Sequence, residues 1–140
     1  MKRIWTTALP NHAGERVQLA GWLHRLRRHS KVSFLILRDA RGLAQIVVEE
    51  PSLVERLAEL YNESVISVEG DVSAEAQAPN GVEVREPKVT VVSAASSPPP
   101  IDLFRPALQA QLPTILDYAP LALRHPRHRA LFQVSAASML

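Results

Sequence analysis

"VQLAGWLHRLRRHSKVSFLILRDARGLAQIVV", residues 17–48, holds three short apolar runs separated by a basic segment and a turn. Apolar residues alternate over 17–23, which is the pattern of a strand with one buried face. A second apolar run covers 32–37, and a Gly-containing turn at 39–42 precedes a third run at 43–48. The connections are short, so the three predicted strands form an antiparallel meander.

A helix and two further strands are predicted after this stretch. Ser52 is expected to be the N-cap of the helix, with Glu55 three residues later as in a capping box, and the helix is expected to end near Asn62. "VISVEGDV" at 65–72 predicts a fourth strand, and residues 82–92 predict a fifth.

The order of these elements predicts the fold class. Three strands, a helix and two strands are the order of the OB-fold, an all-β, five-stranded Greek-key barrel with a helix between strands 3 and 4. Gly21 inside the first strand indicates a bulge or a sharp bend, and Pro87 inside the fifth indicates an edge or a bulge. OB-folds bind oligonucleotides on strands 2 and 3 and in the loops after strands 1 and 4. The basic segment and Pro79 fall in those two loops.

The composition changes after the fifth strand, so three parts are predicted. Residues 1–94 form the barrel domain, and 95–120, which contain three successive prolines, form an extended linker. Residues 121–140 are apolar on one side at helical spacing and are expected to be helical. They end without a helix stop signal, so we expect them to be the start of a truncated second domain.

The totals of the sequence exclude several classes of protein. There is no cysteine, which excludes disulfides and thiolate metal sites and fits a cytoplasmic location. No apolar run approaches the roughly 20 residues of a membrane span, and the N-terminus lacks the features of a signal peptide. The histidines have no companion carboxylates at metal-site spacing, and no nucleophile motif or phosphate-binding glycine loop is present. The sequence therefore predicts neither a metal site nor a catalytic residue within these 140 residues.

The net charge of +2 conceals a division along the chain. Residues 22–41 are strongly basic, whereas 49–88 are acidic. The basic residues of the first segment are Arg25, Arg27, Arg28, Lys31, Arg38 and Arg41. Such a local patch indicates either a polyanion site or a solvated strand face, and charge alone does not separate the two.

Four residues of the predicted barrel are candidates for binding nucleic acid. Arg25 and Arg27 share one strand face by two-residue alternation, and Phe34 lies on the neighbouring strand. Arginine binds phosphate or base edges, and an exposed aromatic ring stacks on an unpaired base. Gln45 on the third strand carries an amide that both donates to and accepts from a base edge. The alternatives are that Phe34 is a core residue and that Gln45 is an ordinary surface residue.

The same residues carry a family resemblance. The Gly21-Trp22 pair, the Arg-rich segment, "F-x-x-x-R-D", the "R-G" turn and "Q-I-V-V" resemble the N-terminal anticodon-binding domain of class IIb aminoacyl-tRNA synthetases, the aspartyl-tRNA synthetases in particular. The resemblance continues through "VISVEGDV" and "VEVREPKVTVVSAA". "LALRHPRHRALFQVSAASML" is similar to the start of the catalytic domain of these enzymes.

The resemblance implies a role for each candidate. Phe34 matches the aromatic that stacks on the central anticodon base, and Gln45 matches the glutamine that reads that uridine. Arg25 and Arg27 match arginines that contact the anticodon stem-loop. His24 and Pro79 match the pair found in enzymes that charge both aspartate and asparagine tRNAs, whereas discriminating enzymes tend to have Trp and Lys there. This match implies relaxed reading of the third anticodon base.

The loop after Arg27 departs from the pattern of the family. The family commonly has Asp and a Gly-containing turn where this chain has Arg28, His29, Ser30 and Lys31. This departure makes the loop more basic and changes its expected shape.

For an intact enzyme the resemblance implies a two-step reaction. ATP and Mg²⁺ would activate aspartate as an adenylate, which is then transferred to tRNA(Asp) and, with relaxed reading, to tRNA(Asn). A homodimer is expected for the intact enzyme, whereas the 140 residues alone are expected to bind tRNA only. Three alternatives remain at this point: the equivalent domain of an asparaginyl- or lysyl-tRNA synthetase, a stand-alone OB-fold that binds single-stranded nucleic acid, and a protein-interaction domain.

Overall fold

The computed structural model describes residues 3–97, 103 and 119–138. The chain divides into two compact units, Met1–Pro98 and Pro99–Leu140. The predicted linker at 95–120 lies mostly outside the described residues, as do the last two residues of the chain.

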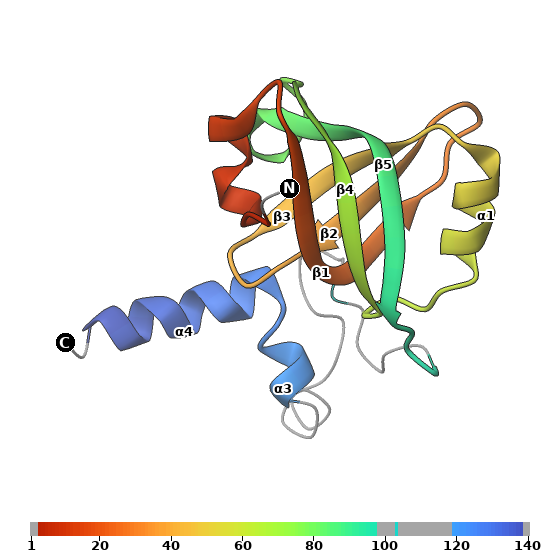
Figure 1. Cartoon of the computed structure of the whole chain (residues 1–140). Coiled ribbons are helices and arrows are strands. Elements are labelled where there is room, and N and C mark those ends of the chain that lie inside the picture. The colour runs from red at the N-terminus through yellow and green to blue at the C-terminus, as the bar shows by residue number, and fades with distance from the viewer. Residues whose placement is uncertain (1–2, 98–102, 104–118, 139–140) are drawn as a thin grey trace. The chain divides into compact units, whose positions relative to one another are not determined.

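The first unit is a closed five-stranded barrel (Figure 1). Its strands follow the spatial order β1-β2-β3-β5-β4, with β4 paired back to β1. Every strand pair is antiparallel except β3 with β5, which run parallel through Ile46 and Val84. The strands are β1 (Arg16–Arg27), β2 (Ser33–Arg38), β3 (Leu43–Val48), β4 (Val65–Ala74) and β5 (Val82–Ser93). With helix α1 (Pro51–Ala58) between β3 and β4, this architecture confirms the predicted OB-fold.

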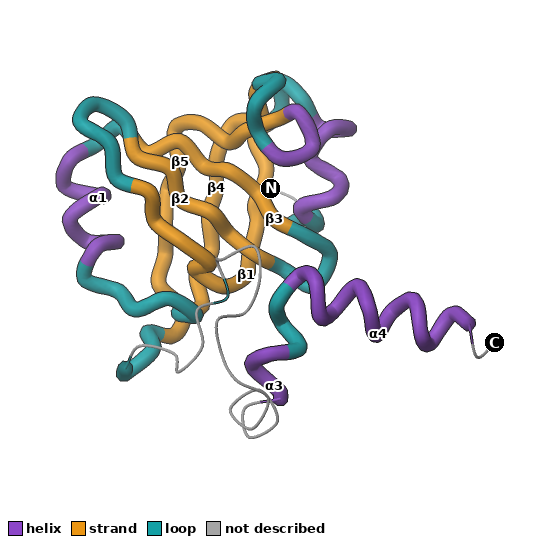
Figure 2. The backbone as a smooth tube through the Cα atoms, turned by 180° about the vertical axis from the view of Figure 1, so that it is seen from behind, coloured by secondary structure: helices purple, strands orange, loops and turns teal. Residues whose placement is uncertain are grey.

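Two short helices lie on opposite sides of the barrel. Figures 1 and 2 agree in placing α1 on one side and the 3₁₀ helix η1 (Thr6–His12) on the other. Leu53 and Leu57 of α1 and Leu9 of η1 are buried in the same core cluster as the inward side chains of the strands. Strand alternation supplies most of that core, for example Leu19, Leu23, Leu35, Leu37, Ile46, Ile66 and Val68.

The structure corrects the expected start and end of the helix. Ser52 is not the N-cap, because the cap position is Glu50 and no side chain caps the helix. Instead, the Ser52 hydroxyl donates to the Glu50 carboxylate at 2.5 Å. Pro51 occupies the first turn, where a missing N–H costs nothing, and the helix ends at Ala58 rather than near Asn62.

The bulge expected at Gly21 lies three residues later. Leu23 pairs with Leu37 and Arg25 pairs with Ile36, so the extra residue is His24. Gly21 is needed for close approach, since a Cβ there would lie 2.2 Å from the carbonyl oxygen of Arg38.

The irregularity expected at Pro87 is a bulge. Glu69 pairs with Lys88 and Asp71 with Arg85, so that Gly70 alone faces Glu86 and Pro87. A Cβ on Gly70 would lie 2.8 Å from the carbonyl oxygen of Arg85. This absence of a side chain lets the bulged strand approach closely.

The second unit contains two described helices, α3 (Ala119–Ala122) and α4 (Pro126–Ser138). The His125 ring is buried before α4, and its Nδ1 accepts a hydrogen bond from the Arg127 backbone N–H at 3.2 Å. Leu131, Phe132 and Val134 of α4 are exposed. None of the helices in the described ranges is long and apolar enough to cross a membrane.

Candidate nucleic-acid interface

The β1–β2 hairpin brings two of the predicted binding residues together. Arg27 of β1 pairs directly with Phe34 of β2, and Arg25 pairs with Ile36. Arg25 and Arg27 are both exposed, while Leu26 between them packs against the core. The two arginines therefore share the outer face, as alternation predicted.

Phe34 and Gln45 lie on the outer face of neighbouring strands. Phe34 pairs with Val47, and Ile36 pairs with Gln45, so Phe34 and Gln45 are diagonal neighbours. Phe34 is half-buried outside the core cluster, so the alternative of a core aromatic is wrong. Its ring is available from the outer face.

A hollow of about 410 Å³ joins three of the candidates. Arg27, Phe34 and Gln45 line it together with residues of β5 and of the loop between β4 and β5. The other residues of its lining are Val32, Val47, Glu49, Glu75, Gln77, Glu83 and Arg85. Its polar groups converge around one aromatic ring, which is the composition of a site for a planar polar ligand.

A chain of polar contacts fixes the amide of Gln45. Its Nε2 donates to the Glu83 carboxylate at 3.3 Å. Glu83 is 3% exposed, and its other oxygen accepts from Arg85 at 2.9 Å and 2.7 Å. The amide nitrogen of Gln45 is thereby turned toward β5, so the amide oxygen is left as the acceptor on the opposite side.

The charges of this hollow favour a base over a phosphate group. Glu49, Glu75 and Glu83 outnumber the two arginines of the lining, Arg27 and Arg85. A phosphate placed inside would meet repulsion from the carboxylates, whereas a neutral base edge would meet hydrogen-bonding groups.

The basic loop between β1 and β2 is tied down at two points. Arg28 donates to Glu55 of α1 at 3.1 Å. The His29 ring meets the Phe34 ring edge-on, with centroids 5.7 Å apart and an interplanar angle of 74°. His29 of this loop thus supports the ring of Phe34.

His24 and Pro79 are not among the residues that line this hollow. His24 is 6% exposed, and its Nδ1 lies 3.1 Å from a guanidinium nitrogen of Arg38. Arg38 in turn donates to both carboxylate oxygens of Glu63, at 3.0 Å and 2.5 Å. Pro79 begins the 3₁₀ helix η2 (Pro79–Gly81), which contacts β3 and η1.

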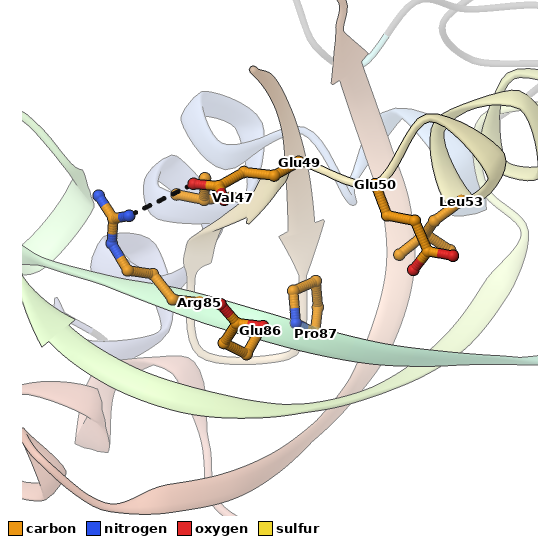
Figure 3. A pocket seen from close by; sticks show the side chains of 7 residues that line it. All are labelled: Val47, Glu49, Glu50, Leu53, Arg85, Glu86 and Pro87. Carbon is orange, nitrogen blue, oxygen red and sulfur yellow. Dashed lines mark ion pairs between the residues drawn. The ribbon is translucent and has the colours of Figure 1, made fainter. Parts of the chain in front are cut away.

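A smaller hollow of about 120 Å³ adjoins this site (Figure 3). In Figure 3 the Arg85 guanidinium faces Glu49, with 3.6 Å between nitrogen and oxygen, and Glu50 lies beside Leu53. Glu49, Glu50 and Glu86 line this hollow against a single arginine, so it is a poor place for a polyanion.

Two residues of the site were not predicted from the sequence. Glu83 and Arg85 stand two apart in "VEVR", so alternation could have placed them on one outer face. The contact of Glu83 with Gln45 depends on the parallel pairing of β3 with β5, which no local pattern shows. Among the described residues, no group of three or more histidine, aspartate or glutamate side chains could hold a metal.

Comparisons with known proteins agree with this fold. The family model tRNA_anti-codon, an OB-fold nucleic acid binding domain, matches residues 17–92. The Aspartate--tRNA(Asp/Asn) ligase of Natronomonas pharaonis is 40% identical over 127 residues, covering 88% of this chain and 29% of that protein. The ligase of the same name from Methanosarcina barkeri is 37% identical over 125 residues, covering 86% of this chain and 28% of that protein.

Solved structures show the same fold. Asparaginyl-tRNA synthetase from Pyrococcus horikoshii, complexed with asparaginyl-adenylate, is 34% identical with a TM-score of 0.78 and covers 94% of this chain and 31% of its own. Aspartyl tRNA synthetase from Entamoeba histolytica has a TM-score of 0.83 at 20% identity, over 98% of this chain and 35% of its own. This chain spans about three tenths of the curated relatives it matches. The chain belongs to the family of tRNA anticodon-binding OB-fold domains.

Proposed function

We propose that the chain is the anticodon-reading part of an aspartate–tRNA ligase and binds the anticodon loop on the outer face of β1, β2 and β3. The observation that carries the proposal is the shared lining of one hollow by Arg27, Phe34 and Gln45. The curated relatives are named as aspartate–tRNA(Asp/Asn) ligases, and an asparaginyl enzyme is not better supported than an aspartyl one.

The hollow suits the central uridine of the anticodon. Phe34 offers a ring for the base to stack on, held at its edge by His29. Uracil donates through N3–H and accepts through its carbonyl oxygens, and the oriented amide of Gln45 matches that pattern with one acceptor and one remaining N–H. Arg25 and Arg27 are exposed on the same strand face, where they would bind backbone phosphates.

The third anticodon base is proposed to be read loosely. His24 presents a smaller ring than the indole expected in discriminating relatives, and Arg38 already holds that ring. Pro79 has no side-chain donor with which to select cytosine or uracil. Both tRNA(Asp) and tRNA(Asn) are therefore proposed partners, in line with the Asp/Asn names of the relatives.

The chemical step belongs to the longer enzyme that the relatives represent. ATP and Mg²⁺ would serve aspartate activation in its catalytic part, of which residues 121–140 are proposed to be the beginning. A homodimer is likewise proposed for the intact enzyme. Class II motifs 2 and 3 in the coding sequence downstream of Leu140 would support this part of the proposal, and an immediate stop codon would overturn it.

The RNA-binding part is tested with anticodon stem-loops and the 140-residue chain. The stem-loop of tRNA(Asp) should bind more tightly than one whose central uridine is replaced, and Gln45→Ala should remove most of that preference. Stem-loops with C or U at the third position should bind within a few-fold of each other. An affinity that does not depend on the identity of the central base refutes the assigned site. A strong preference for C at the third position refutes relaxed reading.

A further inference from the structure

Trp5 is an exposed aromatic ring with two guanidinium groups against it. The residue is 43% exposed and stands at the N-cap position of η1. The guanidinium carbon of Arg3 lies 5.8 Å from the ring centroid, and that of Arg41 lies 5.4 Å from it. These are cation–π distances, so the indole holds both cations near one another.

The fold, and not only this stacking, brings the three residues together. Asp39, in the turn before Arg41, accepts hydrogen bonds from the Thr6 backbone N–H and hydroxyl, both at 2.8 Å. The same carboxylate accepts from the backbone N–H groups of Arg41 and Gly42 at 2.8 Å and 3.0 Å. The start of η1 and the β2–β3 turn are therefore clamped to each other, which sets Arg41 beside Trp5.

The two cations of this cluster lack an acidic partner within the described part of the chain. The ion pairs found there involve neither Arg3 nor Arg41. Asp39 is buried, and its oxygens are occupied by the four donors just described. Two exposed guanidinium groups fixed a few ångströms from one ring repel each other, and a shared anion would relieve that repulsion.

The cluster is separate from the hollow that holds Phe34. From Phe34 to Arg38 the strand β2 runs four residues, or about 13 Å at roughly 3.3 Å per residue, and the turn with Arg41 lies beyond it. The basic β1–β2 loop is tied to α1, whereas η1 lies on the other side of the barrel (Figure 1). One nucleotide cannot occupy both places.

We propose that Arg3, Trp5 and Arg41 form a second RNA contact, which binds backbone phosphates of the RNA whose bases lie in the Phe34 hollow. Guanidinium groups bind phosphate oxygens through paired N–H donors, and the indole keeps them in place and offers its own surface to a sugar or a base. The inference rests on the proposed anticodon binding, and it adds a second site at η1 and the β2–β3 turn, away from the Phe34 hollow.

The test is the salt dependence of binding by the 140-residue chain. Each phosphate contact contributes roughly 0.7 to 0.9 to the slope of log K against log salt. The double variant Arg3→Gln/Arg41→Gln should therefore lower the slope by about 1.4 to 1.8. Between 50 and 200 mM KCl its affinity for the tRNA(Asp) anticodon stem-loop should fall about 7- to 12-fold less than that of the wild type.

A charge-matched control distinguishes a local phosphate contact from an effect of the net charge of the protein. Arg16→Gln/Lys88→Gln removes the same charge from exposed side chains of β1 and β5, both of which pair with β4, and its slope should stay near that of the wild type. A second measurement uses Trp22→Phe, which leaves Trp5 as the one tryptophan of the two in the sequence. Its emission should change on titration with the stem-loop.

The outcomes distinguish this inference from the proposed function. If Phe34→Ala weakens binding while the Arg3/Arg41 variant keeps the wild-type slope, anticodon binding stands and the second contact is overturned. Equal slope changes in the two double variants also overturn it, because they indicate net charge alone. If the wild type binds no stem-loop, the proposed function itself fails.

Discussion

The buried carboxylate of Glu83 offers a direct test of how the site reads a base. Glu83 accepts from Gln45 at 3.3 Å and from Arg85 at 2.9 Å and 2.7 Å. Glu83→Gln keeps the shape of the side chain but leaves only one accepting atom. The charged Arg85 takes that oxygen, because charge-assisted hydrogen bonds are roughly twice as strong as neutral ones. The new amide nitrogen then faces the amide nitrogen of Gln45.

Two facing donors force the Gln45 amide to turn over. Its oxygen would accept from residue 83, and its nitrogen would point into the hollow, where N3–H of uracil needs an acceptor. A matched bidentate contact discriminates between bases by about 1–3 kcal/mol, which is about 5- to 150-fold in affinity. The variant should lose most of this preference for uridine over cytidine at the central position.

The assay is fluorescence anisotropy with two anticodon stem-loops that differ only in a central U or C. Glu49→Gln is the control, because it removes the same charge from the same hollow without touching Gln45. Circular dichroism melts would check that both variants fold. A Glu83→Gln protein that keeps the wild-type U/C ratio, or a Glu49→Gln protein that loses it equally, would refute the orientation argument.

Three further predictions concern stacking, close packing and the clamp. Phe34→Ala should weaken stem-loop binding by about 1–3 kcal/mol, which is the range for one base–aromatic stack, and should change the melting temperature little. The control Phe132→Ala, which removes an exposed aromatic ring of α4, should leave the affinity unchanged. Gly21→Ala should lower the free energy of unfolding in urea by about 1–3 kcal/mol or more, because its Cβ would lie 2.2 Å from the Arg38 carbonyl oxygen. Gly42→Ala is the control: its Cβ would come no closer than 3.4 Å to another atom, so it should lower that free energy less. Asp39→Asn should lower the free energy of unfolding by about 2–3 kcal/mol, since an amide cannot accept all four hydrogen bonds that join η1 to the β2–β3 turn. An unfolding free energy within error of the wild type would contradict this role of Asp39.

What the sequence predicted well was local. Alternation placed Arg25 and Arg27 on one face, and it placed Phe34 on the adjoining strand, because a strand repeats every two residues. The order of elements predicted the barrel, since few arrangements close five strands with a helix after the third. Resemblance, and not pattern, separated Phe34 from a core aromatic.

What the sequence did not predict depends on closure of the barrel. The Gln45–Glu83 contact joins residues 38 apart, and the Thr6–Asp39 contact joins residues 33 apart. Neither pair has a periodic signature, because each requires that a distant element arrive at the right register. The sequence indicated a bulge or a bend at Gly21, whereas the bulge lies at His24, for the same reason. The partner strand β2 determines both where the bulge lies and why glycine is needed at position 21.

The distribution of charge across the face argues for a folded RNA loop as its ligand. The hollow beneath Phe34 contains three carboxylates, so a linear strand lying along it would place phosphates against them. Its lining has only two cations, Arg27 and Arg85, whereas Arg25 on the same strand face and Arg28 in the adjoining loop lie outside it. A loop that turns its bases inward and keeps its phosphates outward satisfies both regions at once. A binder of single strands without sequence preference needs the reverse, a continuous basic groove beneath the backbone. The same acidic interior that repels such a strand also holds the Gln45 amide, through Glu83, in the orientation proposed for reading a base.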